Sequence, residues 1–139
     1  GLTFTLAYAL SDFTFADFRS PAGSFDGNQL PGIPGHRLSA ELFFVHRSGF
    51  YLRNSFSMND RIYADDANSG FAQGQAVVHL QAGMEMKYQW LEAEPYVGLN
   101  NIFNSKYYDN IRINAFGGRY FEPAPPFNLY GGISVRFGN

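Results

Sequence analysis

The chain contains no cysteine, which excludes a disulfide scaffold, a thiol nucleophile and a thiolate metal site. Charged residues are scarce at 16 %, against ~25 % in typical soluble domains. Ten basic and twelve acidic residues give a net charge of −2, a balance that does not indicate a nucleic-acid partner. No stretch approaches the ~18 consecutive apolar residues of a transmembrane helix. The first residues carry neither an initiator methionine nor a signal-peptide pattern. We therefore expect either a processed protein or a piece of a longer one, and we favour the second interpretation.

Aromatic residues are abundant, at 18 %, and hydrophobic residues reach 45 %, which is too apolar for a disordered chain. The dominant pattern has period two, with apolar and polar side chains alternating, as is typical of β-strands. Each alternating segment is close to the ~9–11 residues that a tilted strand needs to cross a bilayer. The six predicted strands are Leu2–Phe15, Arg37–Val45, Tyr51–Tyr63, Val77–Tyr88, Leu91–Phe103 and Asn128–Phe137.

The connections between these segments alternate between short and long. His46–Gly49 and Gln89–Trp90 are predicted to be tight turns. The other three connections are long loops in which Gly, Pro or Asp recur, namely Ala16–His36, Ala64–Ala76 and Asn104–Phe127. Up-and-down strands joined by turns at one end and long loops at the other are typical of an outer-membrane β-barrel.

Alternation alone does not decide which face of each strand meets which solvent. A soluble barrel would bury the apolar faces, whereas a membrane barrel turns them to lipid. Aromatic residues cluster near strand ends, as at Tyr88 and Trp90, which fits the aromatic girdles at a membrane surface. We therefore favour lipid. Because closed single-chain membrane barrels start at ~8 strands, further strands or further copies are expected to complete the barrel.

Four segments carry a family resemblance. The most recognisable is PYVGLNNIFNSKYYD (Pro95–Asp109), with its Asn-Asn-x-Phe-x-x-Lys-Tyr-Tyr string. The others are LPGIPGHRLS (Leu30–Ser39), NDRIYADDANS (Asn59–Ser69) and FEPAPPFNLYGGISVRF (Phe121–Phe137). In this order they resemble the C-terminal part of the β-barrel of TonB-dependent outer-membrane receptors, along nearly the whole chain. Members of that family normally end on the terminal aromatic residue, whereas here Gly138 and Asn139 follow it.

The resemblance implies an all-β fold, in which residues 1–139 form an antiparallel up-and-down transmembrane β-barrel segment of about six strands. Short periplasmic turns and long extracellular loops are expected, in the outer membrane of a Gram-negative bacterium. The implied function is non-enzymatic, TonB-energised uptake of a scarce ligand such as an iron–siderophore complex, without a cofactor. The implied partners are outer-membrane lipid, the remainder of the barrel, the plug domain and, through the absent N-terminal part, TonB. The alternatives are a small outer-membrane barrel, acting as a pore or a lipid-modifying enzyme, and a soluble β-barrel that binds a small apolar ligand.

Arginine and tyrosine side chains on the predicted external loops are candidates for binding an anionic ligand through charge-assisted hydrogen bonds and stacking. These candidates are Arg19, Tyr107, Tyr108, Arg112, Arg119 and Tyr120. Polar and charged residues on the polar faces are expected to line the lumen and to pair with one another or with a plug. These are Arg37, Glu41, Arg53, Arg61, His79, Glu85, Glu92 and Arg136.

No metal site and no catalytic site is predicted. The acidic group of Asp60, Asp65 and Asp66 lacks the Asp-x-Asp-x-Asp-Gly pattern of a calcium loop, so we expect a solvated loop there. The three histidines lie in separate segments without the spacing of zinc ligands. Ser55 or Ser57 can lie near His79 on successive strands, but no Gly-x-Ser-x-Gly turn supports a nucleophile.

Overall fold

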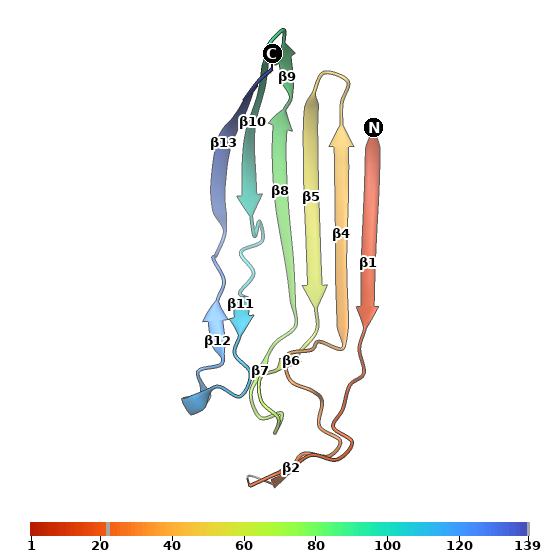
Figure 1. Ribbon diagram of the computed structural model, residues 1–139, viewed down its shortest axis with the longest axis vertical. Coiled ribbons are helices and arrows are strands. Elements are labelled where there is room, and N and C mark those ends of the chain that lie inside the picture. The colour runs from red at the N-terminus through yellow and green to blue at the C-terminus, as the bar shows by residue number, and fades with distance from the viewer. Residues whose placement is uncertain (22, 139) are drawn as a thin grey trace.

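One long antiparallel sheet dominates the computed structural model, which describes residues 1–21 and 23–138. Its strands pair in the order β1-β4-β5-β8-β10-β13, with β9 beside β10 (Figure 1). The bounds are β1 Leu2–Leu10, β4 His36–Val45, β5 Phe50–Asn59, β8 Gln75–Met84, β9 Met86–Tyr88, β10 Leu91–Asn100 and β13 Asn128–Phe137. The strands therefore follow one another up and down, as the sequence predicts.

Three short ribbons extend the loops beyond one end of this sheet. They are β2 (Arg19–Ser20) with β3 (Gly23–Ser24), β6 (Ile62–Tyr63) with β7 (Phe71–Ala72), and β11 (Tyr108–Ile111) with β12 (Phe121–Pro123). A single 3₁₀ turn, η1 (Phe116–Gly118), lies in the last loop. Figure 1 shows these ribbons at the lower end, whereas the two tight turns and both chain termini lie at the upper end. The predicted alternation of short and long connections is thus confirmed.

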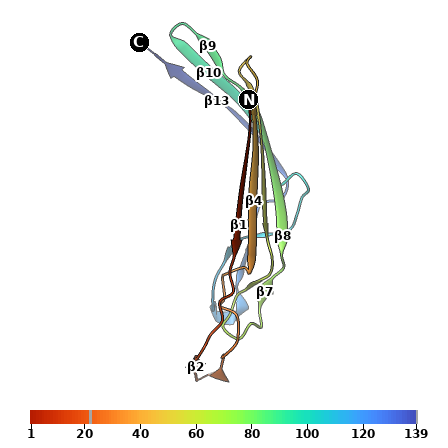
Figure 2. The same ribbon diagram turned by 90° about the vertical axis from the view of Figure 1, so that its right-hand side faces the viewer.

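The sheet is a single layer, and β9, β10 and β13 bend away from the other strands at the turn end (Figure 2). Strands β1 and β13 form its two edges. Within the described part of the chain no helix is long and apolar enough to cross a membrane.

The pairing register gathers the apolar side chains on one face. Leu6 pairs with Ala40, Ala40 with Phe56, and Phe56 with Val78, in one unbroken row across four strands. Leu80, Leu99 and Leu129 continue the same face over the last strands. This face is uncovered, since Phe4 is 64 % exposed and Ile133 is 62 % exposed. Contiguous apolar surface of this extent marks a membrane or protein interaction site.

Several predicted strand ends are wrong, because the chain leaves the sheet earlier. The first strand ends at Leu10 rather than Phe15, since Ser11 donates its N–H to Gly35 and Phe15 donates to Asn28, both within the first long loop. The third strand ends at Asn59 rather than Tyr63, and the chain then pairs within its own loop as β6 and β7.

Two further strand boundaries also differ from the prediction. The fifth strand ends at Asn100 rather than Phe103, because the next residue, Asn101, adopts a left-handed φ of 52°. The fourth strand begins at Gln75 rather than Val77 and is interrupted at Glu85. The N–H of Glu85 bonds to the carbonyl of Gly49, which continues the pairing of Phe50 with Met84 by one residue into the β4–β5 turn.

Tyrosine and glycine alternate across the polar face in a row that we call the Tyr–Gly row. It consists of Tyr51, Gly83, Tyr96 and Gly132 on β5, β8, β10 and β13. A Cβ atom placed on Gly83 would lie 2.4 Å from the ring carbon Cζ of Tyr51, and one on Gly132 would lie 2.6 Å from the hydroxyl of Tyr96. Each of these two glycines therefore lets a tyrosine ring lie flat over the neighbouring strand, which pins the register between strands.

We expect Gly83→Ala to destabilise the sheet by about 1–3 kcal/mol, because the added methyl overlaps a ring that the strands hold in place. The unfolding midpoint in urea, measured on the polypeptide in detergent micelles, checks this. In a Tyr51→Ala background the same substitution should cost much less. Equal costs in both backgrounds would show that the ring does not constrain Gly83.

Candidate functional site

The loop between β6 and β7 folds around a buried carboxylate. Asp65 is only 6 % exposed. Its Oδ1 accepts the N–H of Ser69, and its Oδ2 accepts the N–H of Gly70 and the Ser69 hydroxyl, each at 2.8 Å. The loop thus closes on one side chain, and the expectation of a solvated acidic group is wrong for Asp65.

Burial of Asp65 opposes its ionisation, but hydrogen bonds from Ser69, Gly70 and the Tyr120 hydroxyl outweigh this effect. The pKa of Asp65 consequently lies below its ordinary value of 3.8. Partial desolvation and the charge of Asp65 raise the pKa of the Tyr120 hydroxyl in return. Tyr120 belongs to the last loop, so this contact joins two loops that are far apart in sequence.

The same loop contacts the first and last loops through further polar side chains. Asn68 and Gln29 exchange two hydrogen bonds of 2.8 Å between side chain and backbone. The side-chain oxygen of Asn114 accepts the N–H of Asp66 at 3.1 Å, and its side-chain nitrogen donates to the Asp66 carboxylate at 2.9 Å. The three long loops therefore form one connected cluster at the loop end of the sheet, with residues 65–69 at its centre.

A second buried polar residue fixes the start of the last loop. Asn101 is 1 % exposed, and its left-handed φ of 52° turns the chain out of β10. Its side chain donates to the carbonyls of Ser105 (2.8 Å) and Pro125 (3.4 Å) and accepts the N–H of Ser105 (2.8 Å). Asn101 is not among the predicted site residues, although it lies in the most recognisable motif of the chain.

A cleft of about 600 Å³ lies beside the loop that Asn101 fixes. One wall comes from the segment that enters β8, and the other from the two ends of the last loop. Its lining residues are Phe71, Gln73, Gln75, Asn104, Ser105, Lys106, Tyr107, Tyr108, Pro123, Ala124 and Pro126. Gln75 occupies a polar-face position of the sheet, opposite Asn59, so the cleft adjoins the polar face at its loop end.

Only two of the six predicted ligand-binding residues, Tyr107 and Tyr108, line this cleft. Tyr108 also stacks on Phe121 with a centroid distance of 4.7 Å. Arg112 forms an ion pair with Glu122, whose pKa is lowered by hydrogen bonds from Asn110 and Arg112. Tyr120 bonds to Asp65, as described above.

The other two predicted residues lie elsewhere at the loop end. Arg19 lies in the first loop, 3.7 Å from Asp17, and Arg119 is exposed beside η1. The structure thus brings together the two tyrosines and does not gather the three arginines. Lys106, which is not among the predicted ligand-binding residues, is the cation among the lining residues of the cleft.

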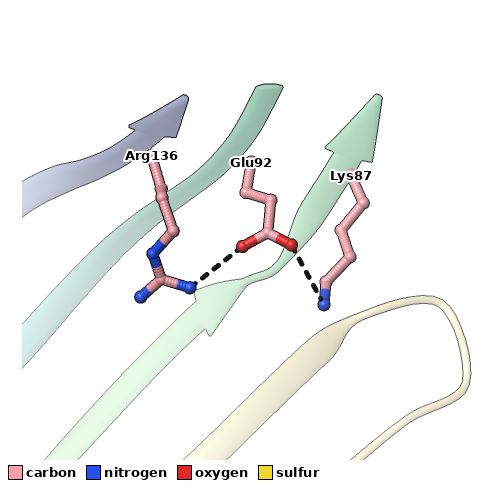
Figure 3. A network of polar contacts seen from close by, with 3 residues as sticks. All are labelled: Lys87, Glu92 and Arg136. Carbon is pink, nitrogen blue, oxygen red and sulfur yellow. Dashed lines mark hydrogen bonds and ion pairs between the residues drawn. The ribbon is translucent and has the colours of Figure 1, made fainter. Parts of the chain in front are cut away.

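The predicted lumen residues fall mainly on the polar face. Near the turn end Glu92 joins Lys87 at 3.4 Å and Arg136 at 3.0 Å, which connects β9, β10 and β13 (Figure 3). The guanidinium of Arg53 lies 4.9 Å from the centroid of the Phe43 ring. Register places Arg37 and Glu41 on this same face, opposite Asn59 and Ser55.

Two predicted lumen residues lie outside the regular strands. Arg61 follows the end of β5, and its guanidinium sits 4.4 Å from the centroid of Phe71 in the loop cluster. Glu85 occupies the interruption between β8 and β9. The strand predicted through Tyr63 placed Arg61 in the sheet, and the early strand end corrects this.

His79 takes part in a polar row across the sheet. Its Nδ1 lies 3.1 Å from the Asn100 amide oxygen, and the Asn100 amide donates to Asn128 at 3.0 Å. Ser55 lies opposite His79 in the register. Among the described residues no group of His, Asp and Glu side chains has a geometry that could hold a metal ion.

No protein-family model matches the sequence. Solved structures do match. The siderophore receptor PiuA from Acinetobacter baumannii aligns with 98 % of this chain at a TM-score of 0.77 and 14 % identity. The ferric citrate transporter FecA in its unliganded form aligns with 81 % at a TM-score of 0.70 and 16 % identity. The chain has the fold of a TonB-dependent receptor barrel segment.

This barrel segment spans 19 % of the length of PiuA and 18 % of that of FecA. The expected all-β, up-and-down architecture is therefore confirmed. Both structural relatives are transport receptors rather than enzymes.

We expect Asp65→Asn to release the loop of residues 64–74, because an amide nitrogen in place of either carboxylate oxygen faces another donor. Hydrogen-exchange protection at Ser69 and Gly70 should fall about tenfold or more.

A folded pKa below 3.8 means that ionised Asp65 stabilises the fold above its ordinary pKa and loses this effect as the pH falls through the folded value. The protection factor of the unsubstituted loop should therefore persist at pH 5 and drop below pH 3.8, whereas the Asn variant should show no such step. Asp109→Asn, at an exposed carboxylate, is the control and should leave both amides protected.

Asn101 offers a separate test of the last loop. Asn101→Gly keeps the left-handed backbone but removes three hydrogen bonds, whereas Asn101→Ala also adds strain at φ 52°. We expect both to destabilise the barrel segment, with alanine worse than glycine by about 1 kcal/mol. Urea unfolding of the two variants checks this order. Equal stability of the two would show that the left-handed turn imposes no constraint on residue 101.

Proposed function

We propose that this chain is the C-terminal segment of the β-barrel of a TonB-dependent outer-membrane receptor that takes up a scarce ligand such as an iron–siderophore complex. The observation that carries the proposal is the apolar face, which is continuous over six strands and uncovered. A soluble sheet would have to cover that face with a second layer, because its exposure to water is unfavourable at roughly 25 cal/mol per Å².

The two sheet edges support the same proposal. Strands β1 and β13 each present an outer edge to no described strand, and a bilayer does not tolerate unpaired backbone groups. Closure with further strands of a longer chain satisfies both edges, and the segment accounts for only 19 % of the length of a receptor that it resembles. By their names, the structural relatives handle a siderophore and ferric citrate, which supports an iron complex as the ligand.

In this proposal the polar face lines the lumen against the plug domain. The Glu92 network ties three strands together near the periplasmic turns. The joined loops face the outside and hold the ligand, while TonB acts through a part of the receptor outside this chain. The polar row of His79, Asn100 and Asn128 has a structural role here, and transport involves no covalent step.

Single-cysteine labelling tests which face meets lipid, and the absence of native cysteine from this chain leaves no background label within it. In the whole receptor polypeptide in outer-membrane vesicles, we expect Leu80→Cys and Ile133→Cys to react with a lipid-soluble maleimide and to resist a charged one. Their matched neighbours, Gln81→Cys and Ser134→Cys, should react with a charged maleimide once the membrane is permeabilised.

Any cysteine native to the rest of the polypeptide is replaced first, and Ser48→Cys in the β4–β5 turn serves as the water-accessible control. If Leu80→Cys is protected from both reagents and the protein remains soluble without detergent, the apolar face is a buried core. That outcome would replace the receptor proposal with a soluble β-barrel.

A further inference from the structure

An apolar groove lies on the uncovered face of the sheet, close to the β4–β5 turn. It has a volume of about 380 Å³, and the apolar-face side chains that line it are Phe50, Ala82, Met84, Pro95 and Val97. Phe50, Met84 and Val97 are 41 %, 40 % and 48 % exposed. Ala82 has the smallest of these side chains, so a larger residue there would fill the groove. The groove is thus an open apolar hollow near the turn end of the sheet.

The rim next to the groove has a step, because two neighbouring hairpins end at different heights. β5 begins at Phe50, and the carbonyl of Gly49 just before it accepts the N–H of Glu85 at 2.9 Å. β9 continues beyond this bond, and it pairs with β10 but with no described strand on its other side. N–H groups two residues apart in a strand point to the same side. The N–H of Lys87 therefore points into the step and supplies a backbone donor there.

The β4–β5 turn beside this step carries a positive charge. Arg47 is exposed, and its guanidinium has no ion-pair or hydrogen-bond partner among the described residues. Nδ1 of His46 accepts the N–H of Ser48 at 3.2 Å, so a neutral His46 ring carries its proton on Nε2. The His46 ring also lies 6.5 Å from the ring of Phe44 on the apolar face. The turn therefore presents a cation and a ring N–H donor where the apolar face ends.

The carboxylates at this end of the sheet belong to the polar face. Glu92 is paired with two cations, and Glu94 accepts the Tyr51 hydroxyl at 2.8 Å. Glu85 lines the same polar-face hollow as these two glutamates. The positive charge of Arg47 thus stands at the edge of the apolar face, and charge complementarity favours an anionic group there. A phospholipid combines such a group with chains that suit the groove.

We propose that the groove and the step form a binding site for one anionic phospholipid of the periplasmic leaflet, such as phosphatidylglycerol. The inference rests on the proposed receptor function, which turns the apolar face to lipid, and adds a specific lipid site to it. One acyl chain lies in the groove over Ala82. The phosphate lies at the step, where it accepts hydrogen bonds from the Arg47 guanidinium, from Nε2 of His46 and from the N–H of Lys87.

Phosphatidylglycerol is the probe, and the protein is the whole receptor polypeptide in micelles of an uncharged detergent. Native mass spectrometry counts the bound lipids, and one molecule should bind more tightly than those that follow. Arg47→Gln should raise the Kd of this first molecule about fivefold to tenfold, because a charge-assisted hydrogen bond is lost, and Arg47→Lys should restore part of the affinity. Ala82→Phe fills the groove and should weaken binding by a similar factor. Phosphatidylethanolamine, whose ammonium group compensates the phosphate charge, should bind more weakly than phosphatidylglycerol.

Two matched variants are the controls, and both should leave the Kd unchanged. Arg119→Gln removes an exposed positive charge at the loop end of the molecule. Ala40→Phe enlarges a small residue of the apolar face outside the groove. If each control weakens binding as much as the variant it matches, or if the first lipid binds no more tightly than later ones, the site is overturned. Equal affinity for the two phospholipids would also overturn it.

The labelling pattern of Leu80 and Gln81 separates the two proposals. If that pattern holds while Arg47→Gln and Ala82→Phe bind phosphatidylglycerol as tightly as the unsubstituted receptor, the phospholipid site is wrong and the receptor proposal stands. If Leu80→Cys is protected from both maleimides in a protein that is soluble without detergent, both proposals are wrong.

Discussion

The structure depends on an unbroken antiparallel register over six strands. Because side chains alternate with period two, a shift of one residue between any two strands would move every apolar side chain of one strand to the polar face. The observed register keeps Leu6, Ala40, Phe56 and Val78 in one row. In a bilayer the same hydrogen bonds also satisfy the backbone, which lipid cannot do. One set of bonds thus fixes both the fold and the two surfaces that it presents.

The loop end follows a different principle, since it has almost no apolar core. Buried apolar side chains in the described β6–β7 loop are few, namely Ile62, Ala64 and Ala72. Asparagine and aspartate side chains replace them by bonding to the backbone of neighbouring loops, as Asp65 and Asn68 do. Four of the five non-glycine residues with positive φ in the described chain are asparagines, at positions 68, 101, 104 and 114, because a short amide tolerates the left-handed region. The loops are therefore ordered by specific polar contacts.

These two principles explain how much the sequence predicts. Period two is a local property, so it identifies all six strands, their faces and the alternation of turns and loops. Strand ends depend on competition between the sheet ladder and pairing within a loop. Ser11 and Phe15 bond to loop residues 24 and 13 positions further along the chain, Gly35 and Asn28. No local pattern contains that information. For the same reason the local sequence did not predict that Asp65 is buried, since its hydrogen-bond partner Tyr120 lies 55 residues away.

Residue type alone was an incomplete guide to the candidate site for a related reason. Arginine and tyrosine suit an anionic ligand, but each is equally able to satisfy a neighbour within the protein. Arg112 is paired with Glu122 and Tyr120 with Asp65, so these side chains build the loop cluster. Tyr107 and Lys106, beside the turn that Asn101 fixes, face a cleft instead. The polar contacts between the loops therefore also decide which of the similar side chains are paired within the protein and which line the cleft.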